Sequence, residues 1–355
     1  MKLIKNATVY GKRVDIAVNG GKIAAIGKFD VEGLDIGGKR LYPGLIDTHL
    51  HGCIGYDVSD KDDHLAEMAD YLLMHGTTSW CPTTMTVSKE DIIAACNRET
   101  KLDHGAEIIG FHLEGPFINP NKKGAQNASF IFRPDVSLLD ECPAAVKITV
   151  APELPGSKAF ITAARDRVLI SLGHSEADYD TAKGAFGAGV RCLTHTFNAM
   201  DGIHHRAPGP ILAAAETDGV FAELIADGKH IHPSVMRMLI EIMGEDRIIL
   251  ISDSIRALGM PDGEYDLGGI NVTITNGTAY TPDMHLAGST SCLFDCVKTL
   301  IGCGVDADAA VRMASEVPAR SLGIKKGKIE VGYDADFIIV DDDFNLIRAI
   351  VGGRF

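Results

Sequence analysis

The chain has 355 residues, 46% of them hydrophobic and 23% charged, which suits one large globular domain or two ordinary ones. Its formal net charge of −14 argues against a nucleic-acid partner, because such binding depends on many Lys and Arg side chains. No apolar run approaches the roughly 20 residues that span a bilayer, and the opening MKLIKNATVY lacks a secretory signal. We therefore expect a cytoplasmic protein without membrane contact. The eight cysteines include no C-x-x-C pair, so we expect reduced thiols.

The two ends of the chain share one character. Residues 1–43 and 327–355 contain short alternating stretches separated by turns, which is typical of antiparallel strands. Neither segment is large enough to bury its own core. We therefore expect the two ends to form one small β-sandwich domain, beside a larger domain over residues 44–326.

The middle of the chain holds eight short segments rich in Val, Ile and Leu, which are typical of buried strands. They are 45–51, 78–84, 108–114, 146–151, 168–174, 191–195, 221–227 and 248–253. Helix-like stretches lie between them, for example 63–75, 176–188 and 234–243. Eight strand–helix units predict an α/β fold, a (β/α)8 TIM barrel. The alternative, an open doubly wound sheet, is disfavoured because no Gly-rich phosphate turn follows the first strand.

Polar residues stand at the ends of several of these strands. In LIDTHLH (45–51), Asp47, His49 and His51 occupy alternate positions, so their side chains share one face. Because TIM-barrel sites lie at the carboxyl ends of the strands, more residues are expected to join them. The residues at these ends are His49, His51, Glu114, His174, His195 and Asp253. Burying so many imidazoles and carboxylates without a cation is costly, so the sequence predicts a site for Zn²⁺ or a similar ion.

Residues 258–285 follow the strand that carries Asp253 and have a hairpin-like character. The sequence leaves two interpretations open, a lid over the site or part of the pocket wall.

Nine motifs spread over nearly the whole chain carry a family resemblance. They are PGLIDTHLHG (43–52), HGTTS (75–79), HLEGPFINPNKKGAQN (112–127), GHS (173–175), THTFNAM (194–200), HRAPG (205–209), ADGKHI (226–231), ISDSIRALG (251–259) and LAGS (286–289). With these motifs the chain resembles the amidohydrolase superfamily and, within it, the N-acetylglucosamine-6-phosphate deacetylases. The HLEGPF and THTFNAM types are particular to the deacetylases.

The resemblance implies the metal ligands and the reaction. Glu114, His174 and His195 would hold a principal metal, and His49 and His51 a second one that Glu114 bridges. One or two divalent metals per subunit are therefore expected, most readily Zn²⁺, with Fe²⁺, Co²⁺ and Mn²⁺ as alternatives. Asp253 would act as general base toward a hydroxide formed at the metal and then give the proton to the departing amine. The products would be acetate and glucosamine 6-phosphate.

The resemblance also implies how the substrate is held. Asn198 and the backbone of Ala199 would bind the phosphate, together with Arg206 from the neighbouring subunit of a homodimer. His230 would meet the sugar hydroxyls. Leu286, Ala287 and Gly288 would line the acetyl end. Gln126 stands where some relatives place a histidine that contacts the substrate carbonyl; its amide can donate the same hydrogen bond but cannot carry a proton.

Three other functions remain open from the sequence. The first is deacetylation of the galactosamine epimer, which differs by one hydroxyl. The second is a cyclic-amide hydrolase of the dihydroorotase type, which usually bridges its metals with a carboxylated lysine on the fourth strand. Lys147 lies at the start of that strand rather than at its end, which disfavours this function. The third is a non-catalytic scaffold, disfavoured because every expected ligand and Asp253 are present.

Overall fold

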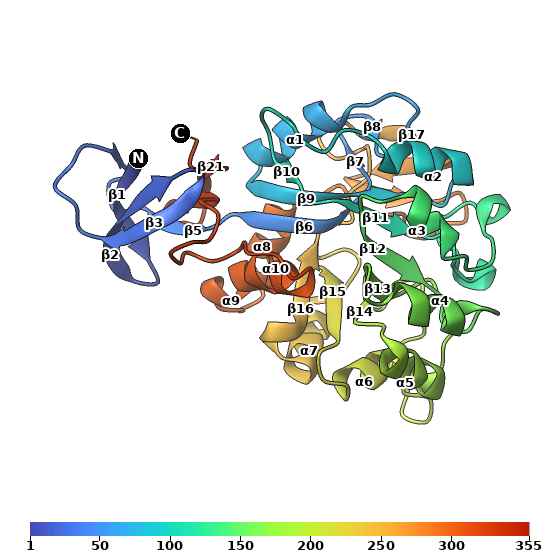
Figure 1. Ribbon diagram of the computed structural model, residues 1–355. Helices are drawn as coiled ribbons and strands as arrows, with labels where there is room; N and C mark the ends of the chain where they lie inside the picture. Colours follow the sequence, from blue (N-terminus) through green and yellow to red (C-terminus); the bar gives the residue numbers. More distant parts are fainter. Residues whose placement is uncertain (355) are drawn as a thin grey trace.

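A computed structural model describes residues 1–354 and shows a small β domain beside a larger barrel (Figure 1). Both ends of the chain lie in the small domain. Its seven strands run in the order β21-β20-β5-β1-β2-β3, with β4 beside β1. Their bounds are β1 (Lys2–Val9), β2 (Lys12–Asn19), β3 (Lys22–Gly27), β4 (Leu34–Asp35), β5 (Arg40–Pro43), β20 (Phe337–Val340) and β21 (Leu346–Ile350).

The expected sandwich takes the form of one continuous sheet that curls over its own core. The two chain ends meet where β5 pairs with β20, with Tyr42 opposite Ile338. The far edge of the sheet, β3, approaches the segment that precedes β20. There the amide of Ile23 donates to the carbonyl of Tyr333 at 2.9 Å. Side chains from both ends of the strand order, such as Ile23 of β3 and Ile350 of β21, therefore share one hydrophobic core.

The larger domain is the predicted TIM barrel. Its parallel strands run in the order β6 (Leu45–Leu50), β9 (Thr77–Thr84), β11 (Phe111–Glu114), β12 (Ala145–Val150), β13 (Leu169–Leu172), β14 (Cys192–Leu193), β15 (Phe221–Ile225) and β16 (Ile248–Ile251), with β10 (Glu107–Ile108) beside β9. Backbone hydrogen bonds join the first and last strands, from Asp253 to the His49 carbonyl at 3.0 Å and from His51 to the Ser254 carbonyl at 2.8 Å. Each barrel strand begins either inside its predicted range or one residue before it.

Helices cover the outside of the barrel. They are α1 (Leu65–Met74), α2 (Lys89–Cys96), α3 (Ser137–Glu141), α4 (Ser157–Ala164), α5 (Tyr179–Ala188), α6 (Gly209–Ala215), α7 (Pro233–Met243), α8 (Leu293–Gly302), α9 (Ala307–Met313) and α10 (Glu316–Ser321). The three predicted helices correspond to α1, α5 and α7. Helix α5 begins later than expected because the Asp178 side chain accepts from the amide of Thr181 and caps the first turn. Among residues 1–354, no helix has the length and apolar character to cross a membrane.

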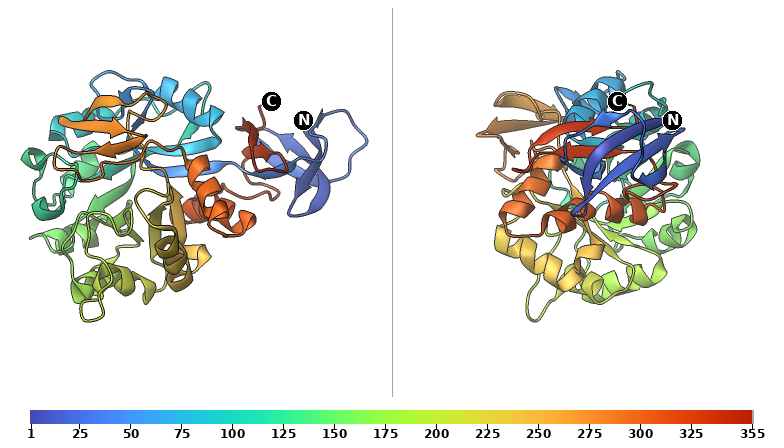
Figure 2. Two further views of the ribbon diagram at one scale, coloured as in Figure 1. Left: turned by 180° about the vertical axis from the view of Figure 1, so that it is seen from behind. Right: turned by 90° about the vertical axis from the view of Figure 1, so that its left-hand side faces the viewer.

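Residues after the Asp253 strand form a small antiparallel sheet of β17 (Gly263–Leu267), β18 (Ile270–Thr275) and β19 (Thr278–Tyr280). Figure 2 shows this sheet, in orange, on the side of the barrel that faces away from the small domain. Leu267 and Ile270 line the cavity at the mouth of the barrel. Of the two interpretations left open by the sequence, the structure supports the pocket wall.

Candidate metal centre and substrate pocket

The six residues predicted at the strand ends converge at the mouth of the barrel. His49 lies in β6 and His51 directly follows it, while Glu114 is the last residue of β11. The other three, His174, His195 and Asp253, each stand two residues beyond the ends of β13, β14 and β16. All six are buried. The barrel therefore gathers residues that are far apart in the sequence.

The three residues beyond the strand ends adopt an unusual backbone. His174, His195 and Asp253 have φ angles of 48°, 28° and 48°, in the left-handed region that non-glycine residues rarely enter. Each carbonyl is held by a hydrogen bond; for example, the Ser289 amide donates to the Asp253 carbonyl at 2.8 Å. The prediction placed these residues inside strands and was wrong on this point. The chain leaves the strand direction before them, in turns that the surrounding hydrogen bonds keep in place.

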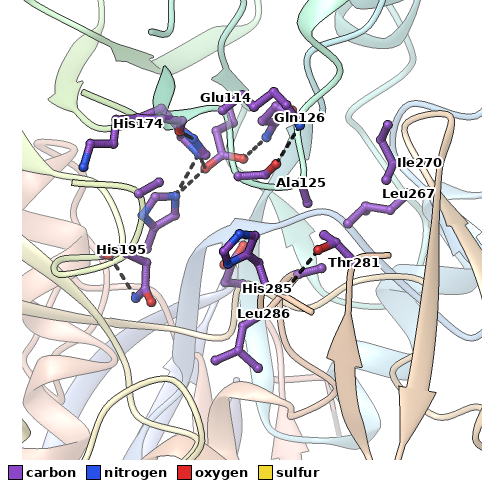
Figure 3. A pocket seen from close by; sticks show the side chains of 18 of the residues that line it. Glu114, Ala125, Gln126, His174, His195, Leu267, Ile270, Thr281, His285 and Leu286 are labelled. Atoms are coloured by element: carbon purple, nitrogen blue, oxygen red, sulfur yellow. Dashed lines mark hydrogen bonds and ion pairs between the residues drawn. The ribbon is translucent and has the colours of Figure 1, made fainter. Parts of the chain in front are cut away.

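Glu114 stands at the centre of the first group of ligands. Its Oε1 atom lies 2.9 Å from Nε2 of His195 and 3.3 Å from Nε2 of His174. The two histidine Nε2 atoms are themselves 3.1 Å apart. Figure 3 shows both rings directed at the Glu114 carboxylate. Two imidazole nitrogens and a carboxylate oxygen in this arrangement are the donor set of a divalent transition metal.

Glu114 belongs to a second group as well. Its Oε2 atom lies 3.1 Å from Nε2 of His51, and its Oε1 atom lies 3.2 Å from Nε2 of His49. The Nε2 atoms of His49 and His51 are 3.3 Å apart. Such close approach of two nitrogens requires a proton or a cation between them, since two lone pairs repel. The residues therefore fit two metal positions that share the Glu114 carboxylate.

The electrostatics of the site favour positive charge. Burial alone would lower the pKa of His49, but the carboxylates of Glu114, Asp253 and Glu223 raise it to about 9. The pKa of His51 is raised as well, because the hydrogen bonds that its ring donates to the carboxylates of Asp253 and Glu114 outweigh its burial. Burial opposes ionisation of Glu114, yet the surrounding histidines hold its pKa well below the usual range. A divalent cation would take the place of these protons.

Two of the histidine ligands have a backbone carbonyl as a fixed partner at Nδ1, the ring nitrogen directed away from the centre, whereas Nδ1 of His195 is buried without a partner among residues 1–354. Nδ1 of His51 lies 3.2 Å from the Thr83 carbonyl, and Nδ1 of His174 lies 2.8 Å from the Lys122 carbonyl. A carbonyl only accepts, so in each ring Nδ1 carries the hydrogen, and in the neutral ring Nε2 then keeps its lone pair for the centre.

Asp253 faces the second group of ligands and the cavity. Its Oδ1 atom lies 3.4 Å from Nε2 of both His49 and His51. Burial opposes its ionisation, but the charge of His49 and the hydrogen bond from His51 lower the pKa of Asp253 below its ordinary value. The carboxylate is therefore ionised at neutral pH and able to accept a proton.

A cavity of about 690 Å³ opens beside the metal ligands. Of the predicted substrate-binding residues, seven line it, namely Gln126, Asn198, Ala199, His230, Leu286, Ala287 and Gly288. Arg206 does not line it: the side chain is exposed, with Nη1 2.6 Å from Nε2 of His205. The cavity is thus built by this chain without Arg206.

Two polar residues of the cavity are already oriented. Gln126 accepts from the Thr86 amide at 2.7 Å through Oε1 and donates through Nε2 to Glu114. Its predicted contact with the substrate carbonyl stays a prediction. Nδ1 of His230 lies 2.7 Å from Oδ2 of Asp227, which leaves Nε2 for a ligand. Asp227 was not anticipated from the sequence.

Sequence reasoning also missed a buried ion pair beneath the ligands. Glu223 of β15 lies 3.1 Å through Oε2 from Nδ1 of His49, and its other oxygen accepts from Lys147 of β12. Burial would raise the pKa of Glu223, but Lys147 and His49 lower it to about 2. Lone charges inside apolar strands, FAELI and AVKITV, are the signal that would have found this pair. Since its ammonium binds Glu223, Lys147 is not a carboxylated metal bridge.

A third group of possible metal ligands consists only of carboxylates. Glu107, Asp334 and Asp336 approach one another at the small domain, but the ammonium of Lys326 already lies 2.7, 3.0 and 2.8 Å from them. We therefore read it as a structural ion pair network.

Comparison with known proteins places these observations in context. Residues 40–355 match the Amidohydrolase family. The chain is 36% identical to the N-acetylglucosamine-6-phosphate deacetylase of Lysinibacillus sphaericus, covering 99% of this chain and 95% of that protein. It is 35% identical to the N-acetylgalactosamine-6-phosphate deacetylase of Escherichia coli O157:H7, covering 94% and 92%. The crystal structure of N-acetyl-D-glucosamine-6-phosphate deacetylase from Mycobacterium smegmatis superposes with a TM-score of 0.93 at 29% identity, covering 100% and 99%.

Proposed function

The chain belongs to the amidohydrolase family, and we propose from this that it hydrolyses the N-acetyl group of N-acetylglucosamine 6-phosphate to acetate and glucosamine 6-phosphate. The single observation that carries the proposal is the similarity over nearly the whole chain to deacetylases of this substrate. The ligand groups around Glu114 support it, because the chain is a metal-dependent hydrolase by family.

We assign the metal positions to two groups that share Glu114, one with His174 and His195 and one with His49 and His51. A divalent metal held there would act as a Lewis acid toward the acetyl carbonyl and lower the pKa of a coordinated water to about 7. Imidazole and carboxylate ligands suit Zn²⁺ best, with Fe²⁺, Co²⁺ and Mn²⁺ as alternatives.

The proton steps fall to Asp253. Its ionised carboxylate borders the cavity and accepts a proton from the attacking water, then returns it to the amine nitrogen as the carbon–nitrogen bond breaks. Gln126 contacts the acetyl carbonyl, and His230 contacts the sugar hydroxyls; both residues line the cavity. The segment from Leu286 to Gly288, which lines the cavity, packs against the acetyl methyl.

The phosphate is bound by local donors, since the net charge of −14 repels an anion at long range. The backbone at Ala199 has a φ of 50° and lies on the cavity wall beside Asn198. No acceptor among the described residues takes the Ala199 amide hydrogen, so the amide is available to a phosphate oxygen. Arg206 lies outside the cavity of its own chain, and we assign it to the phosphate site of the neighbouring subunit of a homodimer.

The compartment proposed for this reaction is the cytoplasm. All eight cysteines are free thiols and seven are buried, as expected for a protein in a reducing environment.

The galactosamine epimer is a second candidate substrate. The relative from Escherichia coli O157:H7, which is 35% identical to this chain, is named an N-acetylgalactosamine-6-phosphate deacetylase. The two sugars differ by one hydroxyl, which His230 or a backbone group would have to distinguish.

Acetate release tests the proposal. Metal-loaded protein is incubated with N-acetylglucosamine 6-phosphate, its galactosamine epimer and unphosphorylated N-acetylglucosamine. We expect rapid acetate release from the first, slower release from the second and little from the third. Faster release from the epimer would reassign the substrate. No release from any of the three by metal-loaded protein would refute deacetylation.

A further inference from the structure

Glu223 contacts both metal-ligand groups from beneath. Its Oε2 atom lies 3.1 Å from Nδ1 of His49 and accepts from the backbone amide of His195 at 3.2 Å. Its Oε1 atom accepts from Lys147 and from Oγ1 of Thr48, the latter at 3.4 Å. The carboxylate is fully buried and receives four hydrogen bonds from the chain.

The contact with His49 fixes the state of the imidazole. An ionised carboxylate only accepts hydrogen bonds, so Nδ1 of His49 must carry the hydrogen. In a neutral ring the lone pair then lies on Nε2, the atom that faces His51 and Glu114. His51 and His174 obtain the same orientation from backbone carbonyls. His49 is thus the ligand oriented by a side-chain carboxylate, which also makes the imidazole a stronger electron donor.

Lys147 keeps this carboxylate charged. Both side chains are fully buried, and an unpaired charge in such a place would be very unfavourable. The ammonium neutralises Glu223 from the side opposite His49. The pair therefore provides a charged hydrogen-bond acceptor inside the barrel without leaving a net charge there.

We propose that Glu223 is a positioning residue for the metal group of His49, His51 and Glu114, and that Lys147 is its counter-ion, so that this buried pair determines whether the chain holds a second metal. The inference rests on the proposed function as a metal-dependent hydrolase. The group of Glu114, His174 and His195 depends on Glu223 only through the backbone of His195. It should hold its metal without the pair.

Metal titration of the double variant Glu223→Gln/Lys147→Met tests this. The two substitutions keep the approximate shapes and remove both charges together, so no unpaired charge remains. Metal-stripped protein is titrated with Zn²⁺ against a chelator of known affinity. We expect the wild type to take up two equivalents and the variant to bind the second one about 10- to 100-fold more weakly. The affinity for the first equivalent should change little.

Asp336→Asn supplies a matched control, because it breaks a different buried contact with a lysine, Lys326, away from the metal ligands. It should keep two equivalents at wild-type affinity. A folded double variant that binds both equivalents like the wild type would overturn the proposal, as would a wild-type protein with no metal at the His49 group. Because no substrate is involved, a failure of deacetylation leaves this test intact.

A second measurement does not depend on the folding of the double variant. In metal-loaded wild-type protein with ¹⁵N-labelled histidines, the resonances of His49 are assigned by their loss in His49→Gln. We expect the hydrogen on Nδ1 of His49. A hydrogen on Nε2 would refute the assigned orientation.

Discussion

Oε1 of Glu114 lies 2.9 Å from Nε2 of His195, although the two residues are 81 positions apart in the chain. They reach each other across the mouth of the barrel, from the end of β11 and from the turn after β14. The same carboxylate also approaches His49 and His51. One side chain therefore links both proposed metal positions.

Substitutions at these ligands should separate the two positions. Glu114→Gln removes the charge that both groups share, so we expect it to lose both metals. His51→Gln affects one group only and should leave one metal per chain. Elemental analysis after dialysis against Zn²⁺ measures this. Two metals bound to Glu114→Gln would contradict a shared carboxylate.

Asp253→Asn tests the proton-transfer role. The amide keeps the shape but cannot accept a proton, so turnover should fall roughly 100- to 10,000-fold, with metal content and thermal stability near wild type. Acetate release and elemental analysis give the two readouts. Asp180→Asn, an exposed acid of α5, is the control and should be as active as wild type. Normal turnover by Asp253→Asn would instead assign the proton transfer to another base.

The raised pKa of His49 makes metal uptake depend on pH. Metal binding requires the neutral ring, while in the metal-free protein the ring is protonated below a pKa of about 9. Uptake at pH 7.5 should therefore release protons, and apparent affinity should rise with pH and level off above about pH 9. Calorimetry in buffers of different ionisation enthalpy counts the protons. Uptake without proton release at pH 7.5 would show that His49 and His51 are already neutral.

Arg206 offers a test of the proposed dimer. Arg206→Ala should lower kcat/KM by about 10- to 100-fold through the loss of a charged contact to phosphate. Mixing it with Asp253→Asn under conditions of subunit exchange should restore activity. One site of the mixed dimer then has Asp253 from its own chain and Arg206 from the partner. Activity equal to the sum of the separate variants would place Arg206 elsewhere.

The glycine before His174 is expected to be needed for packing. A Cβ at Gly173 would lie 2.6 Å from Cβ of Thr194 and 2.9 Å from Cγ2 of Thr149. Gly173→Ala should therefore destabilise the protein by about 1–3 kcal/mol and disturb His174. Gly184→Ala is the control: nothing lies within 4 Å of its Cβ, and it sits inside α5. This change should be neutral or stabilise by up to about 1 kcal/mol in denaturant unfolding. Equal stability of the two variants would refute the steric argument.

The strand and helix rhythm was readable from the sequence because buried parallel strands favour apolar runs such as IILI of β16, and the bounds of β6, β9 and β16 lie close to the predicted ranges. The strand ends were less readable. His174, His195 and Asp253 lie beyond their strands, in turns fixed by hydrogen bonds to distant segments. No local pattern encodes such bonds.

The sequence by itself determined the barrel, the pairing of the chain ends and the six residues at its mouth, because apolar periodicity and ligand chemistry are local properties of the chain. Only the tertiary structure placed the Glu114 carboxylate within 3.3 Å of all four histidine ligands, and only it put the sheet of residues 258–285 on the pocket wall. It also revealed that Glu223 and Lys147 meet beneath His49. These are contacts between side chains on different strands, and their distances follow from the closure of the barrel.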